Sequence, residues 1–193
     1  MAEAPRIAID AMGGDEGPAL MLAGVAQAHL LHPHLRFDLV GDEAAIEVAL
    51  KAHPGLRPVC DIIHAPEIIE GSEKAGQAIR RAKTTSMGIT IDAVKQGRAG
   101  GAVSAGNTGA LMAMAKLALR TMPGIDRPAL AALLPSLGEN DFIMLDLGAN
   151  TECDARNLTE FAIMGAAYSR IALGIARPRV SLLNIGTEDQ KGT

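Results

Sequence analysis

Ten residues decide the fold and the candidate site of this chain: Val103-Ser104-Ala105-Gly106-Asn107-Thr108-Gly109-Ala110-Leu111-Met112. A short apolar run ends at Val103, and helix-forming residues continue from Ala110 to Arg120. A small, polar turn that contains two glycines joins the two runs. The order of strand, turn and helix is typical of an α/β fold, and the first amides of such a helix have no partner within it. Because the helix dipole also favours negative charge there, the stretch predicts a turn suited to an anion.

The turn offers several hydrogen-bond donors to such an anion. Ser104, Asn107 and Thr108 contribute side-chain donors, and Gly106 and Gly109 let the backbone approach a ligand that a Cβ would repel. An ordinary βα turn with Thr108 as the helix N-cap explains the same residues equally well. The spacing is neither GxGxxG nor GxxxxGKS/T, so it identifies no nucleotide.

The composition excludes several classes of protein. The chain has 193 residues, 48% of them apolar, which is enough for one substantial core. A formal net charge of −4, with one Tyr and no Trp, argues against nucleic acid as a partner. No apolar run approaches the roughly 18 residues of a membrane span. Cys60 and Cys153 match no zinc or CxxC spacing and fit a reducing cytoplasm.

Segments typical of strands and helices alternate along the chain, which predicts an α/β fold with a mostly parallel, helix-covered sheet. The expected strands are residues 6–10, 35–40, 58–64, 101–104, 129–135, 141–147 and 180–185. The expected helices are residues 18–32, 43–52, 73–82, 87–96, 110–120 and 157–173. Ser86 is the expected N-cap of the fourth helix, and Asn157 with Glu160 resembles a capping box for the last. The short turn at 137–140 predicts an antiparallel hairpin.

The sequence shows no internal repeat and no low-complexity linker, so residues 1–193 are expected to form a single α/β domain. The last expected strand, 180–185, is followed by a polar stretch that contains no helix to cover it. We therefore expect this chain to be the N-terminal portion of a longer protein.

Small, polar, glycine-rich loops follow four of the expected strands. They are residues 10–15, residues 104–109 after the strand expected to be central, residues 146–151 and residues 184–192. Ligands of open parallel sheets bind beyond the carboxyl ends of the strands, so several of these loops should share one rim. Such a rim suits phosphate or a carboxylate. Each loop alone also has a structural explanation, such as a turn at Gly13-Gly14, a cap at Asp10 or a solvated Lys191.

Other reactive side chains lack partners in the sequence. His32 and His34 flank a proline and would supply two metal ligands at most. Cys153 lies between Glu152 and Asp154, whose charges disfavour a thiolate nucleophile. Neither a metal site nor a covalent cysteine mechanism is expected.

Six motifs in this order make the chain resemble the PlsX-type phosphate acyltransferase family of bacterial phospholipid synthesis. They are Asp10-Ala11-Met12-Gly13-Gly14-Asp15, Leu39-Val40-Gly41-Asp42, Ser104 to Met112, Asp126-Arg127-Pro128, Leu145-Asp146-Leu147-Gly148-Ala149-Asn150 and Leu182-Leu183-Asn184-Ile185-Gly186. The resemblance covers residues 6–193. One departure is Thr187, which stands where the family usually has an acidic residue.

The resemblance implies an enzyme that moves a fatty acyl group from acyl carrier protein to inorganic phosphate. The acyl-phosphate product would serve a membrane glycerol-3-phosphate acyltransferase. The family also implies a three-layer α/β/α sandwich like that of isocitrate dehydrogenase or phosphotransacetylase. It implies a cytoplasmic homodimer that associates peripherally with the inner face of the cell membrane. No metal or organic cofactor is expected.

Site residues follow from matching these motifs to the expected reaction. Phosphate attacks the thioester without a protein nucleophile, so positioning and oxyanion stabilisation should carry catalysis. The expected catalytic residues are Ser104, Asn107 and Lys191. The expected substrate-binding residues are Asp10, Gly13, Gly14, Asp15, Gly106, Thr108, Gly109, Arg127, Asn150, Asn184 and Gly186. Arg81 and Lys83 are expected to carry surface charge, with contact to the acidic carrier protein as the alternative.

Two other functions remain open at this point. A nucleotide-linked enzyme on a related fold would need a fingerprint loop and an acidic residue about 20 positions later, and neither is present. A truncated, non-catalytic homologue would bind acyl carrier protein or another lipid-synthesis partner.

Overall fold

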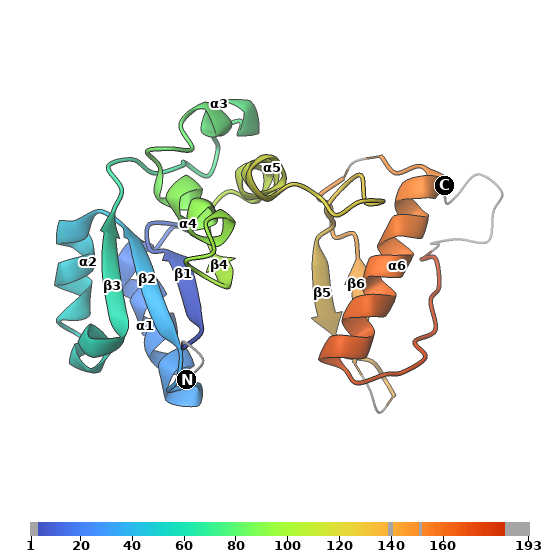
Figure 1. The fold of residues 1–193 in the computed structure, drawn as a ribbon, viewed down its shortest axis with the longest axis horizontal. Helices are drawn as coiled ribbons and strands as arrows, with labels where there is room; N and C mark the ends of the chain where they lie inside the picture. Colours follow the sequence, from blue (N-terminus) through green and yellow to red (C-terminus); the bar gives the residue numbers. More distant parts are fainter. Residues whose placement is uncertain (1–3, 139–140, 151, 184–193) are drawn as a thin grey trace. The chain divides into compact units, whose positions relative to one another are not determined.

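The computed structural model describes residues 4–138, 141–150 and 152–183. The chain forms two compact units, Met1–Arg120 and Thr121–Thr193, called here the N-terminal unit and the C-terminal unit (Figure 1). The expected single domain stays a prediction. Within the described residues, no helix combines the length and apolar character needed to cross a membrane.

The N-terminal unit is built on one parallel sheet of four strands, in the order β3-β2-β1-β4. Its elements are β1 (Arg6–Asp10), α1 (Gly17–Leu31), β2 (Arg36–Gly41), α2 (Glu43–Leu50), the 3-10 helix η1 (Pro54–Val59), β3 (Cys60–His64), α3 (Ala75–Arg80), α4 (Ser86–Lys95), β4 (Gly101–Val103) and α5 (Thr108–Leu119). The predicted α/β class is confirmed. The strand expected to be central, β4, is instead an edge of the described sheet, because among these four strands it pairs only with β1.

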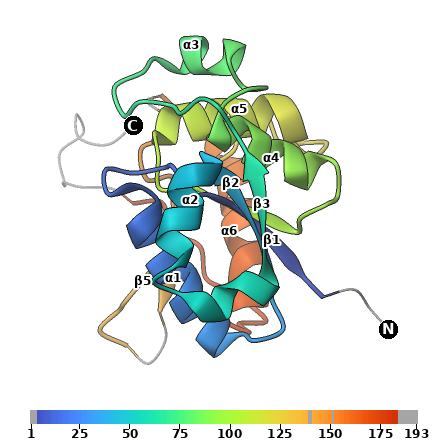
Figure 2. The same ribbon diagram turned by 90° about the vertical axis from the view of Figure 1, so that its left-hand side faces the viewer.

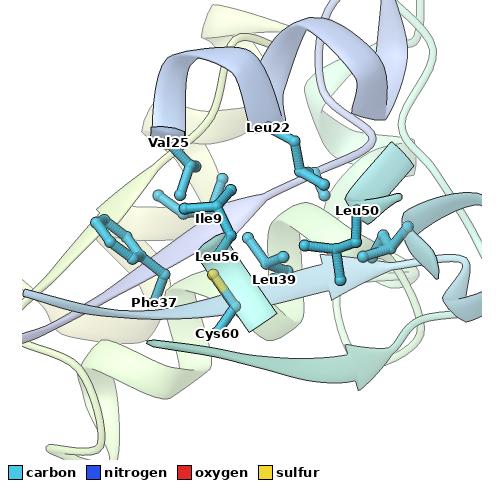
Figure 3. Close-up of a cluster of buried hydrophobic side chains, with 10 residues drawn as sticks. Ile9, Leu22, Val25, Phe37, Leu39, Leu50, Leu56 and Cys60 are labelled. Carbon is cyan, nitrogen blue, oxygen red and sulfur yellow. The ribbon is translucent and has the colours of Figure 1, made fainter. Parts of the chain in front are cut away.

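One face of this sheet carries the main apolar core. Ile9, Phe37 and Leu39 point to this face, while their neighbours along the strands point to the other. They pack against Leu22 and Val25 of α1 (Figure 3). The helices α1 and α2 lie on this side, and α4 lies on the other (Figure 2). Burying side chains of this size contributes roughly 1.5–3 kcal/mol each, so this face anchors β1 and β2 in register.

The opposite face of the sheet is lined by small residues and by acidic groups. Ala8 of β1 packs with Ala93 and Ala99, so α4 lies close to the strands. Asp38 of β2 is buried on this face and pairs with Arg6, which also lies 2.6 Å from Asp61 of β3. A buried carboxylate needs such a partner. The ion pairs of Arg6, which join three neighbouring strands, therefore balance the buried charge of Asp38.

The C-terminal unit contains β5 (Ala131–Leu134), β6 (Phe142–Leu145) and α6 (Ala155–Ala172). The two strands pair antiparallel, which confirms the predicted hairpin. The strand predicted over 180–185 is wrong for residues 180–183, which have no regular secondary structure because no strand of the described residues pairs with them. Residues 184 and 185 lie outside the described residues.

Two predicted helix caps are displaced. Thr85, not Ser86, caps α4 and accepts a hydrogen bond from the Gly88 amide at 3.3 Å. The start of α6 is a capping box between Asp154 and Asn157, so Asn157 occupies the third helical position and is not the cap. The displacement has a physical cause, since the N-cap must have an extended backbone, as Thr85 and Asp154 do.

Candidate functional site

The loops that follow β1 and β4 meet at the carboxyl end of the sheet. Ser104 Oγ donates a hydrogen bond of 2.7 Å to Asp10 Oδ2, although the two residues are 94 positions apart in the sequence. The Gly106 amide donates to the same Ser104 Oγ at 3.1 Å. Because β1 and β4 are adjacent parallel strands, their ends lie at one edge, as the sequence predicted for these two loops.

Asp10 is the innermost group of this cluster. Only 1% of its surface is exposed, and the Met12 amide donates to its Oδ1 at 3.3 Å. Both carboxylate oxygens therefore accept a hydrogen bond, which offsets part of the cost of burying the group. The sequence offered a cap or a substrate-binding residue at this position, and in the structure the carboxylate holds Ser104 in place.

Glycines line the place where the two loops touch. A Cβ on Gly13 would lie 2.9 Å from Asp10 Oδ2, 2.9 Å from Ser104 Oγ and 3.0 Å from the Gly106 nitrogen. A Cβ on Gly106 would lie 2.9 Å from the methyl carbon of Met87. The contact between the loops therefore requires glycine at position 13, where a Cβ would meet main chain, whereas the flexible end of Met87 could move away from a side chain at position 106. The neighbouring Gly14 has a φ of +88°, a conformation that other residues rarely adopt.

Asn107 uses its side-chain amide to join two segments. Its Oδ1 accepts from the Ala110 amide at 2.9 Å, which makes it the N-cap of α5. The cap is thus one residue earlier than Thr108, the alternative considered from the sequence. Its Nδ2 donates to the carbonyl oxygens of Gly71 at 2.8 Å and Glu73 at 2.9 Å. The side chain therefore holds the 70–73 segment against the start of the helix.

The segment that Asn107 holds is itself braced by Arg81. The Arg81 guanidinium donates to Glu67 at 2.7 Å, to Glu73 at 3.0 Å and to the Ile68 carbonyl at 3.2 Å. Its hydrogen bond lowers the pKa of the Glu67 carboxyl. Arg81 is exposed, as its predicted surface charge requires, but these bonds give it a structural role that sequence spacing did not reveal. Lys83 is exposed as well.

The remaining predicted residues of the N-terminal unit lie around this cluster. Thr108 and Gly109 are exposed in the first turn of α5, and Asp15 is exposed in the loop after β1. The amides of a first helical turn have no acceptor within the helix. An exposed first turn beside a polar loop suits an anionic group.

In the C-terminal unit, Asp146 organises the predicted loop. Its Oδ1 accepts from the Leu130 amide at 2.8 Å, and its Oδ2 accepts from the Asn150 amide at 2.7 Å and from Asn150 Nδ2 at 2.8 Å. Burial alone would raise the pKa of Asp146, but these hydrogen bonds outweigh it and lower the pKa. Asn150 also donates to the Pro128 carbonyl at 3.1 Å, so both side chains tie the loop to the start of the hairpin.

Arg127 lies in the same unit and donates to the Glu152 carbonyl at 3.1 Å. Three further predicted residues, Asn184, Gly186 and Lys191, lie outside the described residues. In the part of the chain that the structure describes, no group of three or more His, Cys, Asp or Glu side chains is arranged to hold a metal ion.

Comparison with known proteins identifies relatives of the chain. Residues 5–193 match the model of a family described as "Fatty acid synthesis protein". The phosphate acyltransferase of Erythrobacter litoralis is 66% identical over 189 residues, which cover 98% of this chain and 53% of that protein. The phosphate acyltransferase of Granulibacter bethesdensis is 54% identical over 186 residues, covering 96% and 50%. The chain thus spans about half the length of the curated relatives it matches.

A solved structure supports the fold. The phosphotransacetylase EutD from Staphylococcus aureus superposes with a TM-score of 0.62 at 20% sequence identity, covering 89% of this chain and 54% of that one. At this identity the likeness concerns the fold alone, and it confirms the predicted phosphotransacetylase-like α/β architecture.

Proposed function

The chain belongs to the fatty acid synthesis protein family that comprises the PlsX-type phosphate acyltransferases, and from this membership we propose that it transfers acyl groups to phosphate. The substrates proposed are a fatty acyl thioester of acyl carrier protein and inorganic phosphate. The product is an acyl-phosphate for phospholipid synthesis. The observation that carries the proposal is the 66% identity to a phosphate acyltransferase over 98% of the chain.

The geometry of the N-terminal unit supports a phosphate site after β1 and β4. Ser104 is fixed by Asp10, and the exposed residues Thr108 and Gly109 form the first turn of α5. Phosphate held there would be desolvated on one side and oriented by fixed dipoles. A phosphate oxygen then bonds to the thioester carbonyl carbon, the carbon–sulfur bond breaks, and the carrier thiolate takes up a proton.

We assign roles to the predicted residues on this basis. Ser104, Asn107 and Lys191 are proposed as the catalytic residues, with Asn107 acting at the start of α5. The proposed substrate-binding residues are Asp10, Gly13, Gly14, Asp15, Gly106, Thr108, Gly109, Arg127, Asn150, Asn184 and Gly186. The engagement of Asn107 with the 70–73 carbonyls means that its Nδ2 would reach substrate only after these bonds are exchanged.

The proposed partners follow from the family. They are acyl carrier protein, a second copy of the chain in a homodimer, and a glycerol-3-phosphate acyltransferase that consumes the product. The proposed location is the cytoplasm, with peripheral association at the inner face of the cell membrane.

A second candidate function is a non-catalytic homologue that binds acyl carrier protein. It is favoured by one observation, namely that the side-chain donors of Ser104 and Asn107 are already occupied by Asp10 and by the carbonyls of Gly71 and Glu73. On this alternative, the strand-end loops serve folding and carrier recognition.

One experiment distinguishes the two candidates. The chain is incubated with palmitoyl acyl carrier protein and phosphate, and palmitoyl-phosphate is sought by mass spectrometry. Formation of the product, abolished in the Ser104→Ala variant, supports the acyltransferase. Carrier binding by calorimetry without any product supports the binding module. Absence of both contradicts each proposal.

A further inference from the structure

The proton of the Ser104 hydroxyl is used in a hydrogen bond within the protein. A carboxylate only accepts hydrogen bonds, so the 2.7 Å bond to Asp10 Oδ2 uses the single proton of Ser104. An amide N–H only donates, so the 3.1 Å bond from Gly106 occupies one lone pair of the same oxygen. In the described residues no other group bonds to this oxygen. One lone pair therefore remains, and Ser104 offers a ligand an acceptor and no donor.

The burial of Asp10 fixes the direction of the hydrogen bond between Ser104 and Asp10. The carboxylate is 1% exposed and is held from its other side by the Met12 amide, 3.3 Å from Oδ1. Gly13 lies against it closely enough that a Cβ would come within 2.9 Å of Oδ2. Water has little room to replace Ser104 as the partner of Oδ2. The hydroxyl is thus not free to turn its proton toward a ligand without leaving a buried carboxylate oxygen unpaired.

We propose that the Asp10–Ser104 pair selects an oxyanion that still carries a proton, and so favours hydrogen phosphate over sulfate. This inference rests on the proposed function, because it concerns the phosphate that this site would hold. Among the residues assigned above to substrate binding, Asp10 acts indirectly, through Ser104, and is a positioning residue. Hydrogen phosphate donates its P–OH to the free lone pair of Ser104, whereas sulfate has no proton to donate at neutral pH.

The penalty for sulfate has two parts. Its oxygen would face the Ser104 lone pair, and neither atom would have a hydrogen bond. The buried negative charge of Asp10 would also repel it, with no shared proton to compensate. A site whose polar groups match the correct ligand rejects an analogue that leaves them unpaired. Size and charge do not distinguish the ions at mildly alkaline pH, where hydrogen phosphate and sulfate are both tetrahedral dianions.

The decisive variant is Asp10→Asn, which reverses the polarity without changing the shape. The Met12 amide fixes the side-chain oxygen at the Oδ1 position, so the new NH₂ group faces Ser104 and donates to it. The Ser104 proton is then released toward the ligand. In this variant, Ser104 can donate a hydrogen bond to an unprotonated oxygen of the ligand, which the unaltered chain does not do.

The test is isothermal titration calorimetry of the chain with phosphate, arsenate and sulfate at mildly alkaline pH. The unaltered chain should bind arsenate, which carries a proton, much as it binds phosphate, and should bind sulfate roughly 10- to 100-fold more weakly. In Asp10→Asn the ratio of phosphate to sulfate affinity should fall to about one. Ser104→Ala removes the acceptor and should also lose the discrimination, which keeps the test decisive if Asp10→Asn fails to fold.

A matched control is Glu16→Gln, which removes one exposed negative charge from the loop after β1 without any hydrogen bond to Ser104. Its phosphate to sulfate ratio should equal that of the unaltered chain. Equal binding of sulfate and phosphate by the unaltered chain, or an unchanged ratio in both site variants, would overturn the inference and leave the proposed function standing. Failure of all three ions to bind would overturn the phosphate site itself, and the inference with it.

Discussion

Gly13 lies so close to Ser104 that a Cβ at Gly13 would come within 2.9 Å of the Ser104 hydroxyl oxygen. The same Cβ would approach the main-chain nitrogen of Gly106 to 3.0 Å, and a main-chain atom cannot turn aside as a side chain does. The two strand-end loops therefore fit together only without a side chain at this position.

We expect Gly13→Ala to separate these loops. The variant should lose about 1–3 kcal/mol of unfolding free energy, because overpacking forces the backbone to shift, and acyl transfer should fall more steeply. Urea unfolding followed by circular dichroism measures the first effect. The control is Gly24→Ala in α1, where a Cβ meets nothing within 4 Å and should be neutral or stabilising. A fully stable, fully active Gly13→Ala chain would contradict the packing described.

Two substitutions of Asn107 should separate its two structural roles. Asn107→Asp keeps an oxygen to cap α5 but loses the donation to the carbonyls of Gly71 and Glu73. Asn107→Ala loses both, and the missing cap should cost about 1 kcal/mol more. Hydrogen exchange of residues 70–73 should rise in both variants, while exchange in the first turn of α5 should rise mainly in Asn107→Ala.

The catalytic role proposed for Asn107 makes a separate prediction. Asn107→Ala should lower turnover by a larger factor than it weakens binding of acyl carrier protein, since only turnover depends on the transition state. Steady-state kinetics and calorimetry supply the two numbers. Equal losses of turnover and of carrier binding would contradict a contact between Asn107 and phosphate and would indicate a structural role alone.

Acid should reveal the contribution of Asp146. Hydrogen bonds from Leu130 and Asn150 outweigh burial and hold its pKa below the ordinary value, so the folded state favours the carboxylate. Its stabilisation is therefore complete above the ordinary pKa near 4 and is lost as the pH falls through the lower pKa of the folded state. Asp146→Asn should be about 1–2 kcal/mol less stable at neutral pH, and the difference should shrink below about pH 4.

The control for this pH series is Asp126→Asn. Asp126 pairs with Arg156 at 3.1 Å on an exposed surface, with side chains 50% and 65% exposed, so its loss should cost less than about 0.5 kcal/mol. A gap between the unaltered chain and Asp146→Asn that stays constant down to the acid transition would contradict the assignment.

Thiol labelling should distinguish the two cysteines. Cys60 is buried in the main core, and burial with the nearby charge of Asp61 raises its pKa to about 11. About one molecule in 10,000 would then carry the thiolate at pH 7. In a Cys153→Ser variant, Cys60 should react with a chromogenic disulfide reagent only after urea unfolds the chain. Prompt reaction in native buffer would show that the main core opens readily.

Local rules in the sequence predicted the meeting of the β1 and β4 loops, because adjacent parallel strands end at one edge. The caps were harder, since Thr85 and Ser86 are both good N-cap residues, and the extended backbone of Thr85 goes with a bridge to Glu67, which is distant in the sequence. No local signal links Asn107 to the carbonyls of 70–73, because that contact depends on how the 67–85 segment folds back. The apolar run at 180–183 resembled a strand, yet a strand also needs a partner.

The amide of Asn107 makes two parts of the N-terminal unit thermodynamically dependent on each other. Ordering the 70–73 segment also orders the start of α5, since one side chain is fixed by both. A ligand that immobilises either part therefore lowers the entropic cost of immobilising the other. Linkage is reciprocal. If an anion bound at α5 stabilises that segment, a partner bound to the segment strengthens binding of the anion by the same free energy.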